Sequence, residues 1–369
     1  MTLLAVLALL AWIYLAAGHG RFWQAGPVLS AARPAASPPL AVVVPARDEA
    51  TVVNRTLSSL LAQDYAGPLG IVLVDDGSSD GTGTIARALG GVTVLEAPAR
   101  PAGWAGKPWA LAQGVAATDA EWLLLTDADI EHDPPHVATL VAQAERYGLD
   151  MVSEMVALHR ASLAERALVP AFVYLFQLLY PFAWVNAPAG RTAAAAGGTI
   201  LIRRTVLERA GGIAAIRGAL IDDVALATAV KRAGGRIWLG HSALARSIRP
   251  YPGFADVWRM IARSAYVQLR CSPLLLAGAI LGLLLVFLVP PLAVVLGPLS
   301  ARVLGLIAWT IMAATLLPTL HRCGASPLWA LCLPAIAAFY RAATIGSAID
   351  HYRGRGTVWK KRAYTERQA

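Results

Sequence analysis

Apolar residues are unevenly distributed along this chain: long apolar runs lie near both ends, and the middle alternates short apolar runs with amphipathic stretches. Residues 3–17 form one unbroken apolar run, and three more apolar stretches cover 273–297, 303–320 and 327–349. A helix needs about 20 apolar residues to cross a bilayer, and the first two C-terminal stretches provide them. The pattern predicts a membrane anchor over 1–20 and two spans near the C-terminus.

The third C-terminal stretch carries Pro334 and Arg341 near its middle. An arginine at mid-bilayer costs at least about 2.5 kcal/mol on insertion scales. We therefore expect residues 327–349 to be re-entrant or interfacial, with a full crossing as the alternative. The predicted C-terminal membrane region is 273–350, and the basic residues beyond it favour a cytoplasmic tail over 351–369.

The charges beside the N-terminal apolar run predict its orientation. Arg21 and Arg33 follow the run, and no basic residue precedes it. Because basic residues concentrate on the cytoplasmic side of a span, the chain after this anchor is expected in the cytoplasm. A cleaved secretory signal is the alternative, since Ala16-Ala17-Gly18 loosely resembles a cleavage site, although the run lacks a basic segment before it.

The central part, residues 40–270, alternates runs typical of buried strands with helical stretches. The predicted strands are Leu40–Pro45, Gly70–Asp75, Val92–Leu95 and Glu121–Asp127, and the predicted helices are Glu49–Ala62, Asp80–Leu89 and Pro108–Ala117. Strands alternating with helices indicate an α/β fold, a Rossmann-like parallel sheet with right-handed crossovers. Ligands bind beyond the carboxyl ends of such strands, so acids at those ends are candidate site residues.

Acidic residues follow two of the predicted strands. Asp75 and Asp76 end the second strand in a run of Asp, Gly and Ser, whose composition is also typical of an ordinary turn. Asp127 and Asp129 end the fourth strand, and side chains alternate along an extended chain, so both project to one side while Ala128 points away. Two such carboxylates can supply part of the ligands of a Mg²⁺ or Mn²⁺ ion, and substrate phosphate oxygens and water would supply the rest. The alternative is that the two residues belong to a solvated turn.

Two further positions carry candidate chemistry. Asp222 and Asp223 precede a helical pattern, where acids either stabilise the helix dipole or supply the general base that sugar transfer requires. Lys107 opens a helix after a loop rich in Gly, Trp and Pro, a position that is unfavourable for the helix dipole. This favours a contact with a diphosphate, with a solvated loop lysine as the alternative.

Composition narrows the possible functions. The chain is 57% hydrophobic and 15% charged, whereas about 25% charged residues is usual for a soluble enzyme. The net charge of +9 does not indicate nucleic acid, because the basic residues flank apolar segments and form no single patch. Residues 168–185 are rich in aromatic side chains and almost uncharged, so we expect a helix at the membrane surface near a lipid acceptor, or else a core helix.

The motifs of the central part occur in a recognisable order. They are Val43-Val44-Pro45-Ala46-Arg47-Asp48-Glu49, Val74-Asp75-Asp76-Gly77-Ser78, Gly106-Lys107, Asp127-Ala128-Asp129, Gly197-Gly198-Thr199 and Asp222-Asp223-Val224. In this order they resemble the family-2 inverting glycosyltransferases with the A-type fold. Within that family, the loop Gly103–Lys107 and the arrangement of spans resemble the bacterial hopanoid-biosynthesis-associated glycosyltransferases, relatives of the ceramide glucosyltransferases.

The resemblance implies a role for each matching residue. The residues that would bind the nucleotide-sugar, expected to be a UDP-sugar, are Pro45, Glu49, Asp75, Asp76, Lys107 and Asp127. The metal, Mg²⁺ or Mn²⁺, would be held by Asp129 and Asp127, and the catalytic base would be Asp223. The residues on the acceptor side would be Gly197, Gly198, Thr199, Asp222 and Arg263.

One departure from the family pattern concerns the acceptor. Processive relatives and ceramide glucosyltransferases carry Gln/Arg-x-x-Arg-Trp, whereas the register here reads Met260-Ile261-Ala262-Arg263-Ser264, so only the second Arg remains. The missing Trp favours a single transfer to a lipid over polymer growth. The resemblance thus implies a metal-dependent hexosyltransferase of the bacterial inner membrane that acts on a hopanoid or sphingolipid-like acceptor. The rival functions are a sugar nucleotidylyltransferase-like enzyme and a non-catalytic lipid-handling scaffold.

Overall fold

The computed structural model describes residues 1–354, 357–359 and 362–364 of the chain. The chain divides into two compact units. The helical unit comprises Met1–Gly26, Arg160–Ala183 and the C-terminal part from Pro250, and the sheet unit comprises Pro27–His159 and Trp184–Arg249. Each unit is therefore assembled from segments that are far apart in the sequence.

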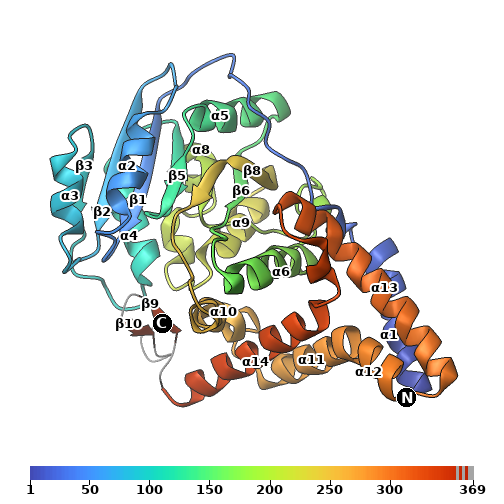
Figure 1. Ribbon diagram of the computed structural model, residues 1–369. Coiled ribbons are helices and arrows are strands. Elements are labelled where there is room, and N and C mark those ends of the chain that lie inside the picture. Colours follow the sequence, from blue (N-terminus) through green and yellow to red (C-terminus); the bar gives the residue numbers. More distant parts are fainter. Residues whose placement is uncertain (355–356, 360–361, 365–369) are drawn as a thin grey trace. The chain divides into compact units, whose positions relative to one another are not determined.

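An eight-stranded mixed sheet forms the centre of the sheet unit (Figure 1). In spatial order its strands are β3 (Thr93–Glu96), β2 (Leu69–Asp75), β1 (Leu40–Ala46), β4 (Trp122–Thr126), β7 (Thr199–Arg203), β6 (Met151–Ala157), β8 (Ile237–Ser247) and β5 (Ile130–His132). The first four strands are parallel, as predicted. β7 runs antiparallel to both β4 and β6, and β5 runs antiparallel to β8. β6 and β8 pair in parallel and run in the direction of the first four strands. The expectation of a parallel sheet is therefore correct for most of the sheet, and β7 and β5 are the reversed strands.

The predicted helices of the sheet unit are present, with shifted limits. They are α2 (Val53–Leu61), α3 (Thr82–Ala88) and α4 (Gly106–Ala116). α2 begins later than expected because Asp48 has a left-handed backbone, with φ 49°, and residues 50–52 form a turn. The remaining helices are α5 (His136–Tyr147), α8 (Arg204–Arg209), the 3-10 turn η2 (Ile213–Ile216) and α9 (Asp222–Arg232).

Strand β1 is buried along its whole length because both faces of the sheet are covered. On one face it packs with apolar residues of α2 and α5, among them Leu57 and Leu140, and burying one such side chain contributes about 1.5–3 kcal/mol. On the opposite face α4 approaches closely: a Cβ added at Gly114 would lie 2.4 Å from Val43 Cγ1. This contact fixes α4, whose first turn carries Lys107, against the central strand.

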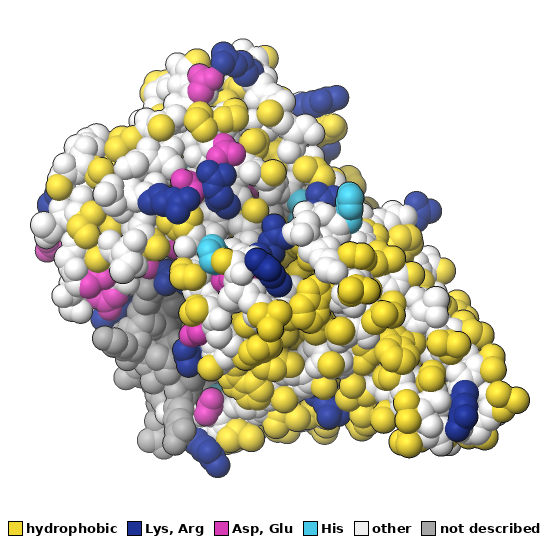
Figure 2. All heavy atoms as spheres, in the orientation of Figure 1, with side chains coloured by type: hydrophobic (Ala, Val, Ile, Leu, Met, Phe, Trp, Pro, Cys, Tyr) yellow, Lys and Arg dark blue, Asp and Glu magenta, His cyan; other side chains and the backbone are white. Residues whose placement is uncertain are grey.

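The helical unit contains the long apolar segments. Its helices are α1 (Thr2–Ala17), α6 (Leu163–Leu179), α10 (Phe254–Gln268), α11 (Pro273–Leu283), the π-helical turn η3 (Leu284–Leu288), α12 (Val289–Leu296), α13 (Leu299–Arg322), the 3-10 turn η4 (Pro327–Ala330) and α14 (Leu333–Tyr352). Among the described residues, Pro273–Leu296 and Leu299–Arg322 have the length and apolar composition of membrane spans, whereas α1 is shorter. Figure 2 shows apolar side chains gathered over the surface of these helices.

The third apolar stretch near the C-terminus forms η4 and then the continuous helix α14. Pro334 lies in the first turn of α14 and not in the middle of a helix, so it disrupts no helical hydrogen bond. Arg341 is partly exposed on α14, which is not one of the two helical stretches that could span a membrane. The re-entrant or interfacial assignment stays a prediction. Of the expected tail, β9 (Thr357–Trp359) and β10 (Arg362–Tyr364) pair as antiparallel strands, and the residues around them lie outside the described part.

The aromatic segment expected at the membrane surface forms α6, followed after Pro181 by the short helix α7 (Phe182–Val185). Tyr174 is fully buried, and its hydroxyl shares a hydrogen bond of 2.8 Å with Thr315 Oγ1. It belongs to a core cluster of the helical unit that also contains Trp12. Much of this segment therefore packs within the helical unit, which favours the alternative of a core helix. Its location at a membrane surface stays a prediction.

Candidate active site

The two predicted metal ligands lie where β4 ends. The side chains of Asp127 and Asp129 are 37% and 15% exposed, whereas Ala128 between them is buried. Both carboxylates are therefore more exposed than the residue between them, as predicted, but residues 128–129 form a turn and not the extended segment from which the prediction was made. Each has a basic partner: Lys107 Nζ lies 2.8 Å from Asp127 Oδ1, and Arg249 Nε lies 2.6 Å from Asp129 Oδ2.

Lys107 connects acids from two distant parts of the sequence. Besides its contact with Asp127, its Nζ lies 3.1 Å from Asp222 Oδ2, in the first turn of α9. Burial alone would lower the pKa of Lys107, but the charges of Asp127, Asp222 and Asp223 outweigh that effect and raise the pKa. These ion pairs distinguish Lys107 from a solvated loop lysine. The side chain is held fully charged where α4 begins, as a site for an anionic ligand requires.

Asp223, the predicted base, is partly buried beside Asp222 and Lys107. Burial and the neighbouring charge of Asp222 raise the pKa of Asp223 to about 6, although Lys107 and the backbone N–H groups of Val224 and Gly197 act in the opposite direction. A carboxylate with this pKa is ionised at neutral pH and is a stronger base than an ordinary aspartate. Asp222 differs from it, because its carboxylate pairs with Lys107.

The predicted acceptor-side turn, residues 197–199, leads into β7. A Cβ added at Gly197 would lie 3.1 Å from Asp223 Oδ2, so a larger residue would crowd that carboxylate. The carbonyl of Gly198 accepts a hydrogen bond from the N–H of Asp127 at 3.3 Å. The turn therefore contacts both the predicted base and a predicted metal ligand.

Arg249 is a residue of this site that sequence reasoning missed. It follows β8, and its Nη2 lies 2.7 and 2.5 Å from the two carboxylate oxygens of Glu49, while its Nε contacts Asp129. Burial would lower the pKa of Arg249, but the two carboxylates outweigh it and raise the pKa. Glu49 is thereby connected to Asp129, a predicted metal ligand. Because β8 was not predicted, no pattern in the sequence placed Arg249 at this edge.

Pro45, Asp75 and Asp76 lie where the neighbouring strands β1 and β2 end. Asp75 Oδ1 accepts the N–H of Ser78 at 2.8 Å, so this residue forms the local turn that was the alternative reading of the motif. The roles of these residues at a nucleotide stay predictions. Arg263, the remaining predicted residue, lies on α10 in the helical unit.

The pair Asp127 and Asp129 fits a divalent cation that is also bound by a substrate. Mg²⁺ is usually held by one or two carboxylates together with phosphate oxygens and water. Burial and the charge of Asp127 raise the pKa of Asp129, so the two carboxylates are close enough to repel each other. No group of three or more His, Cys, Asp or Glu side chains suited to a metal occurs within the described residues. A metal at this pair would therefore take its remaining ligands from a substrate and water.

Comparison with known proteins shows what the central part of the chain is similar to. Residues 41–211 match the family described as glycosyl transferase family 2. The 4,4'-diaponeurosporenoate glycosyltransferase of Staphylococcus aureus is 30% identical over 110 residues, a match that spans 30% of this chain and only 29% of that relative. The structure of a mannosyltransferase from Pyrobaculum calidifontis, in complex with GDP-Man and Mn²⁺, is similar with a TM-score of 0.56 and 21% identity, covering 98% of this chain and 99% of that one. The central part of the chain is therefore similar to family 2 glycosyltransferases, and the structure shares its fold with that mannosyltransferase.

Proposed function

We propose that this protein transfers a sugar from a nucleotide-sugar donor to a membrane lipid, with inversion at the anomeric carbon. The observation that carries the proposal is Asp223, whose pKa is raised to about 6 beside Asp222 and Lys107, the lysine that also pairs with Asp127. The match of residues 41–211 to glycosyl transferase family 2 supports the reaction class. The mannosyltransferase of similar fold, which is described with GDP-Man and Mn²⁺, supports the donor type and the metal.

Asp223 is the proposed general base. It would take the proton of the acceptor hydroxyl while that oxygen attacks the anomeric carbon and the bond from sugar to diphosphate breaks. With a pKa of about 6 it is mostly ionised at neutral pH, and positioned proton transfer contributes about 10²–10⁴-fold to the rate. A single displacement needs one carboxylate on the acceptor side, so no covalent sugar–enzyme intermediate is required.

The donor side would be formed by the acids at the strand ends and by Lys107. Asp127 and Asp129 are the proposed ligands of Mg²⁺ or Mn²⁺, which when bound would offset the negative charge that develops on the departing diphosphate. Lys107 is the proposed contact of the protein itself with the diphosphate, since it is charged and lies beside Asp127. The proposed neighbours of the nucleotide are Pro45, Glu49, Asp75 and Asp76.

The helical unit is the reason for proposing a lipid acceptor. Pro273–Leu296 and Leu299–Arg322 have the length and composition of membrane spans. Leu274 and Leu299 on these helices are 84% and 78% exposed, and large exposed apolar surfaces mark contacts with membranes or partner proteins. We propose a location in the bacterial cytoplasmic membrane with the catalytic domain on the cytoplasmic side. The proposed acceptor is a hopanoid or sphingolipid-like lipid, in line with the resemblance of the sequence.

The test uses purified full-length protein in nanodiscs with a panel of UDP-sugars and GDP-mannose and an extract of bacterial membrane lipids. Mass spectrometry should show a lipid that gains one sugar, a product that is lost with EDTA and restored by Mn²⁺. Asp223→Asn serves as the inactive control. A nucleotidylyltransferase would instead form a nucleotide-sugar and pyrophosphate from a sugar phosphate and a nucleotide, and a lipid-handling scaffold would bind lipid without turnover. Either of those results would refute the proposal.

A further inference from the structure

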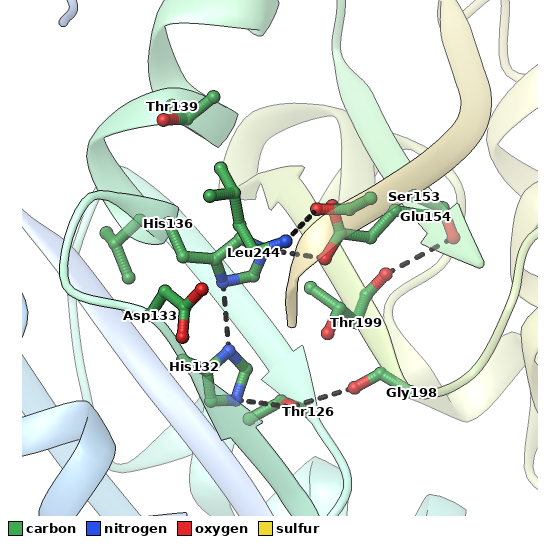
Figure 3. Close-up of polar contacts among 12 residues, drawn as sticks. Thr126, His132, Asp133, His136, Thr139, Ser153, Glu154, Gly198, Thr199 and Leu244 are labelled. Carbon is green, nitrogen blue, oxygen red and sulfur yellow. Dashed lines mark hydrogen bonds and ion pairs between the residues drawn. The ribbon is translucent and has the colours of Figure 1, made fainter. Parts of the chain in front are cut away.

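A buried polar network lies next to the candidate active site, and the proposed mechanism does not use it. Figure 3 shows its members: the side chains of Thr126, His132, His136 and Glu154, and the carbonyl of Gly198. These four side chains are at most 3% exposed. Burying polar groups is costly unless each finds a hydrogen-bond partner, so the position of this network demands an explanation.

The fold builds this network from segments that are separate in the sequence. Thr126 ends β4 and is paired with Thr199 of β7, and Glu154 lies on β6, the next strand in the sheet. His132 ends β5, and His136 begins α5. The network therefore connects three adjacent strands of the sheet to the segment that follows the predicted metal ligands.

The donor and acceptor capacities of these groups fix the direction of the hydrogen bonds. Thr126 Oγ1 donates its one proton to the Gly198 carbonyl at 2.8 Å, so it must accept from His132 Nε2 at 3.2 Å. Burial and the neighbouring His136 lower the pKa of His132, which keeps it neutral. Its Nδ1 therefore accepts from His136 Nδ1, 2.9 Å away. His136 Nε2 lies 2.6 Å from Glu154 Oε1, so one more proton is shared between these two atoms.

All these hydrogen bonds therefore point toward the Gly198 carbonyl. Two neutral imidazoles and an ionised Glu154 would hold one proton fewer than these hydrogen bonds require. The additional proton is the one shared between His136 Nε2 and Glu154 Oε1. The second carboxyl oxygen of Glu154, Oε2, has no hydrogen-bond partner in the described part of the chain. The bond to His136 is consequently the contact that holds this carboxyl group in the interior.

The Gly198 carbonyl is the point where the network meets the candidate active site. This carbonyl also accepts the N–H of Asp127 at 3.3 Å. The preceding residue, Gly197, donates its backbone N–H to the Asp223 carboxylate, which lowers the pKa of that group. One turn of the backbone thus contacts a predicted metal ligand, the predicted base and the buried network.

We propose that the four side chains of this network are positioning residues for glycosyl transfer. They hold the Gly197–Gly198 turn in place and thereby fix Asp127 and Asp223 relative to each other. Because the four side chains are buried, they act through the turn and not on the substrate. The inference rests on the proposed function, since it gives these residues a part in the same reaction.

Thr126 offers a matched pair of variants. Thr126→Val keeps the shape of the side chain but removes the hydroxyl that donates to Gly198 and accepts from His132, whereas Thr126→Ser keeps that hydroxyl. We expect Thr126→Val to lower kcat by up to about 10²-fold, the cost of a small misplacement of reacting groups, with little change in donor KM. Thr126→Ser should restore most of the lost rate.

The pH profile supplies a readout that general destabilisation would not produce. If the turn moves in Thr126→Val, the Gly197 N–H no longer lowers the pKa of Asp223 fully, so the acid limb of kcat/KM should move to higher pH. Asp222 and Lys107, the other charged groups that face Asp223, are unchanged in this variant. Thr126→Ser should keep the limb at the wild-type position.

Glu154 offers a second, independent pair. Glu154→Gln can donate an amide N–H to His136 Nε2, so every hydrogen bond keeps its direction with two neutral imidazoles. The leucine of Glu154→Leu cannot donate a hydrogen bond, so this variant removes the bond between residue 154 and His136 Nε2. We expect Glu154→Leu to lower kcat and Glu154→Gln to retain most of it.

The experiment measures lipid glycosylation and thermal unfolding of full-length protein in nanodiscs for the wild type and both pairs. If the wild type transfers no sugar to any lipid, the proposed function fails and this inference falls with it. If the wild type is active and folded Thr126→Val and Glu154→Leu match it in kcat and in the acid limb, only the positioning inference is overturned. If Thr126→Val does not fold, the Glu154 pair decides: a slow Glu154→Leu beside an active Glu154→Gln supports the inference, and equal rates overturn it.

Discussion

Replacing Asp223 by asparagine should change activity and stability in opposite directions. The environment raises the pKa of this carboxyl from the usual 3.8 to about 6. Ionising it within the folded protein therefore costs at most about 3 kcal/mol relative to the unfolded chain. The uncharged side chain of Asp223→Asn avoids that cost. An acid that only stabilised the first turn of α9 would behave in the opposite way, because its removal would weaken the helix.

The pH dependence follows from the direction of this shift. Below about pH 3 the carboxyl is protonated in both the folded and the unfolded chain, and Asp223→Asn should have the same stability as the wild type. As the pH rises from about 4 to 6, the unfolded chain ionises Asp223 while the folded chain still holds the proton, so the wild type loses stability until both states are ionised above pH 6. We expect the apparent Tm of Asp223→Asn to exceed that of the wild type by about 5 °C or more near pH 8.

The same substitution removes the proposed base. We expect kcat to fall about 10²–10⁴-fold while donor binding is nearly unchanged. Asp222→Asn is the matched control, because it makes the same chemical change one residue away and removes the contact with Lys107 at 3.1 Å. It should cost less activity and should move the acid limb of kcat/KM to lower pH, since the charge of Asp222 raises the pKa of Asp223.

The assay combines thermal unfolding between pH 4 and 8, lipid glycosylation rates, and donor-induced shifts in Tm. Two results would refute the reasoning. The first is an Asp223→Asn protein that is no more stable than the wild type near pH 8, which would mean that the carboxylate is not strained by its surroundings. The second is an equal loss of donor affinity in Asp222→Asn and Asp223→Asn, which would assign both acids to the nucleotide.

Three further predictions concern the metal, the missed arginine and the topology. Asp129→Asn should abolish transfer at limiting Mn²⁺ while expression and membrane insertion are kept, and near-wild-type activity would show that this assignment is wrong. Arg249→Leu should destabilise the protein by about 3 kcal/mol because it removes the ion pairs of two part-buried carboxylates, Glu49 and Asp129. Arg246→Leu, which removes more exposed ion pairs, should cost about 1 kcal/mol or less, and equal Tm values would contradict this. A C-terminal fluorescent fusion should be bright and a phosphatase fusion inactive if the tail is cytoplasmic, and the reverse pattern would indicate a further span.

The parts of the fold that could be predicted depend on local patterns. The strands around Val43, Leu73 and Leu124 are short apolar runs bounded by turn residues, so their type and limits are visible in the sequence. The exposure of Asp127 and Asp129 on either side of buried Ala128 was predicted from the alternation of side chains along a strand, although residues 128–129 form a turn in the structure. No contact with the rest of the protein was needed for these predictions.

The parts that were missed depend on contacts between distant residues. Arg249 and Glu49 are 200 positions apart, and no local pattern relates them. β5 has three residues, which is too short for a recognisable period. The aromatic segment containing Tyr174 has the composition of a membrane-surface helix, and only its bond to Thr315 and its packing show that it is buried.

The antiparallel direction of β7, which the sequence did not reveal, is what completes the site. The predicted acceptor-side turn precedes β7, and Thr199 at the start of this strand is paired with Thr126 at the end of β4. If β7 ran parallel to β4, its start would lie at the opposite edge of the sheet, about 16 Å away for a strand of this length. Gly197 and Gly198 could not then reach Asp223 and Asp127. Transfer requires the reacting groups to meet within about 3–3.5 Å. The reversal of this one strand therefore brings the proposed donor and acceptor sides of the candidate site to one edge.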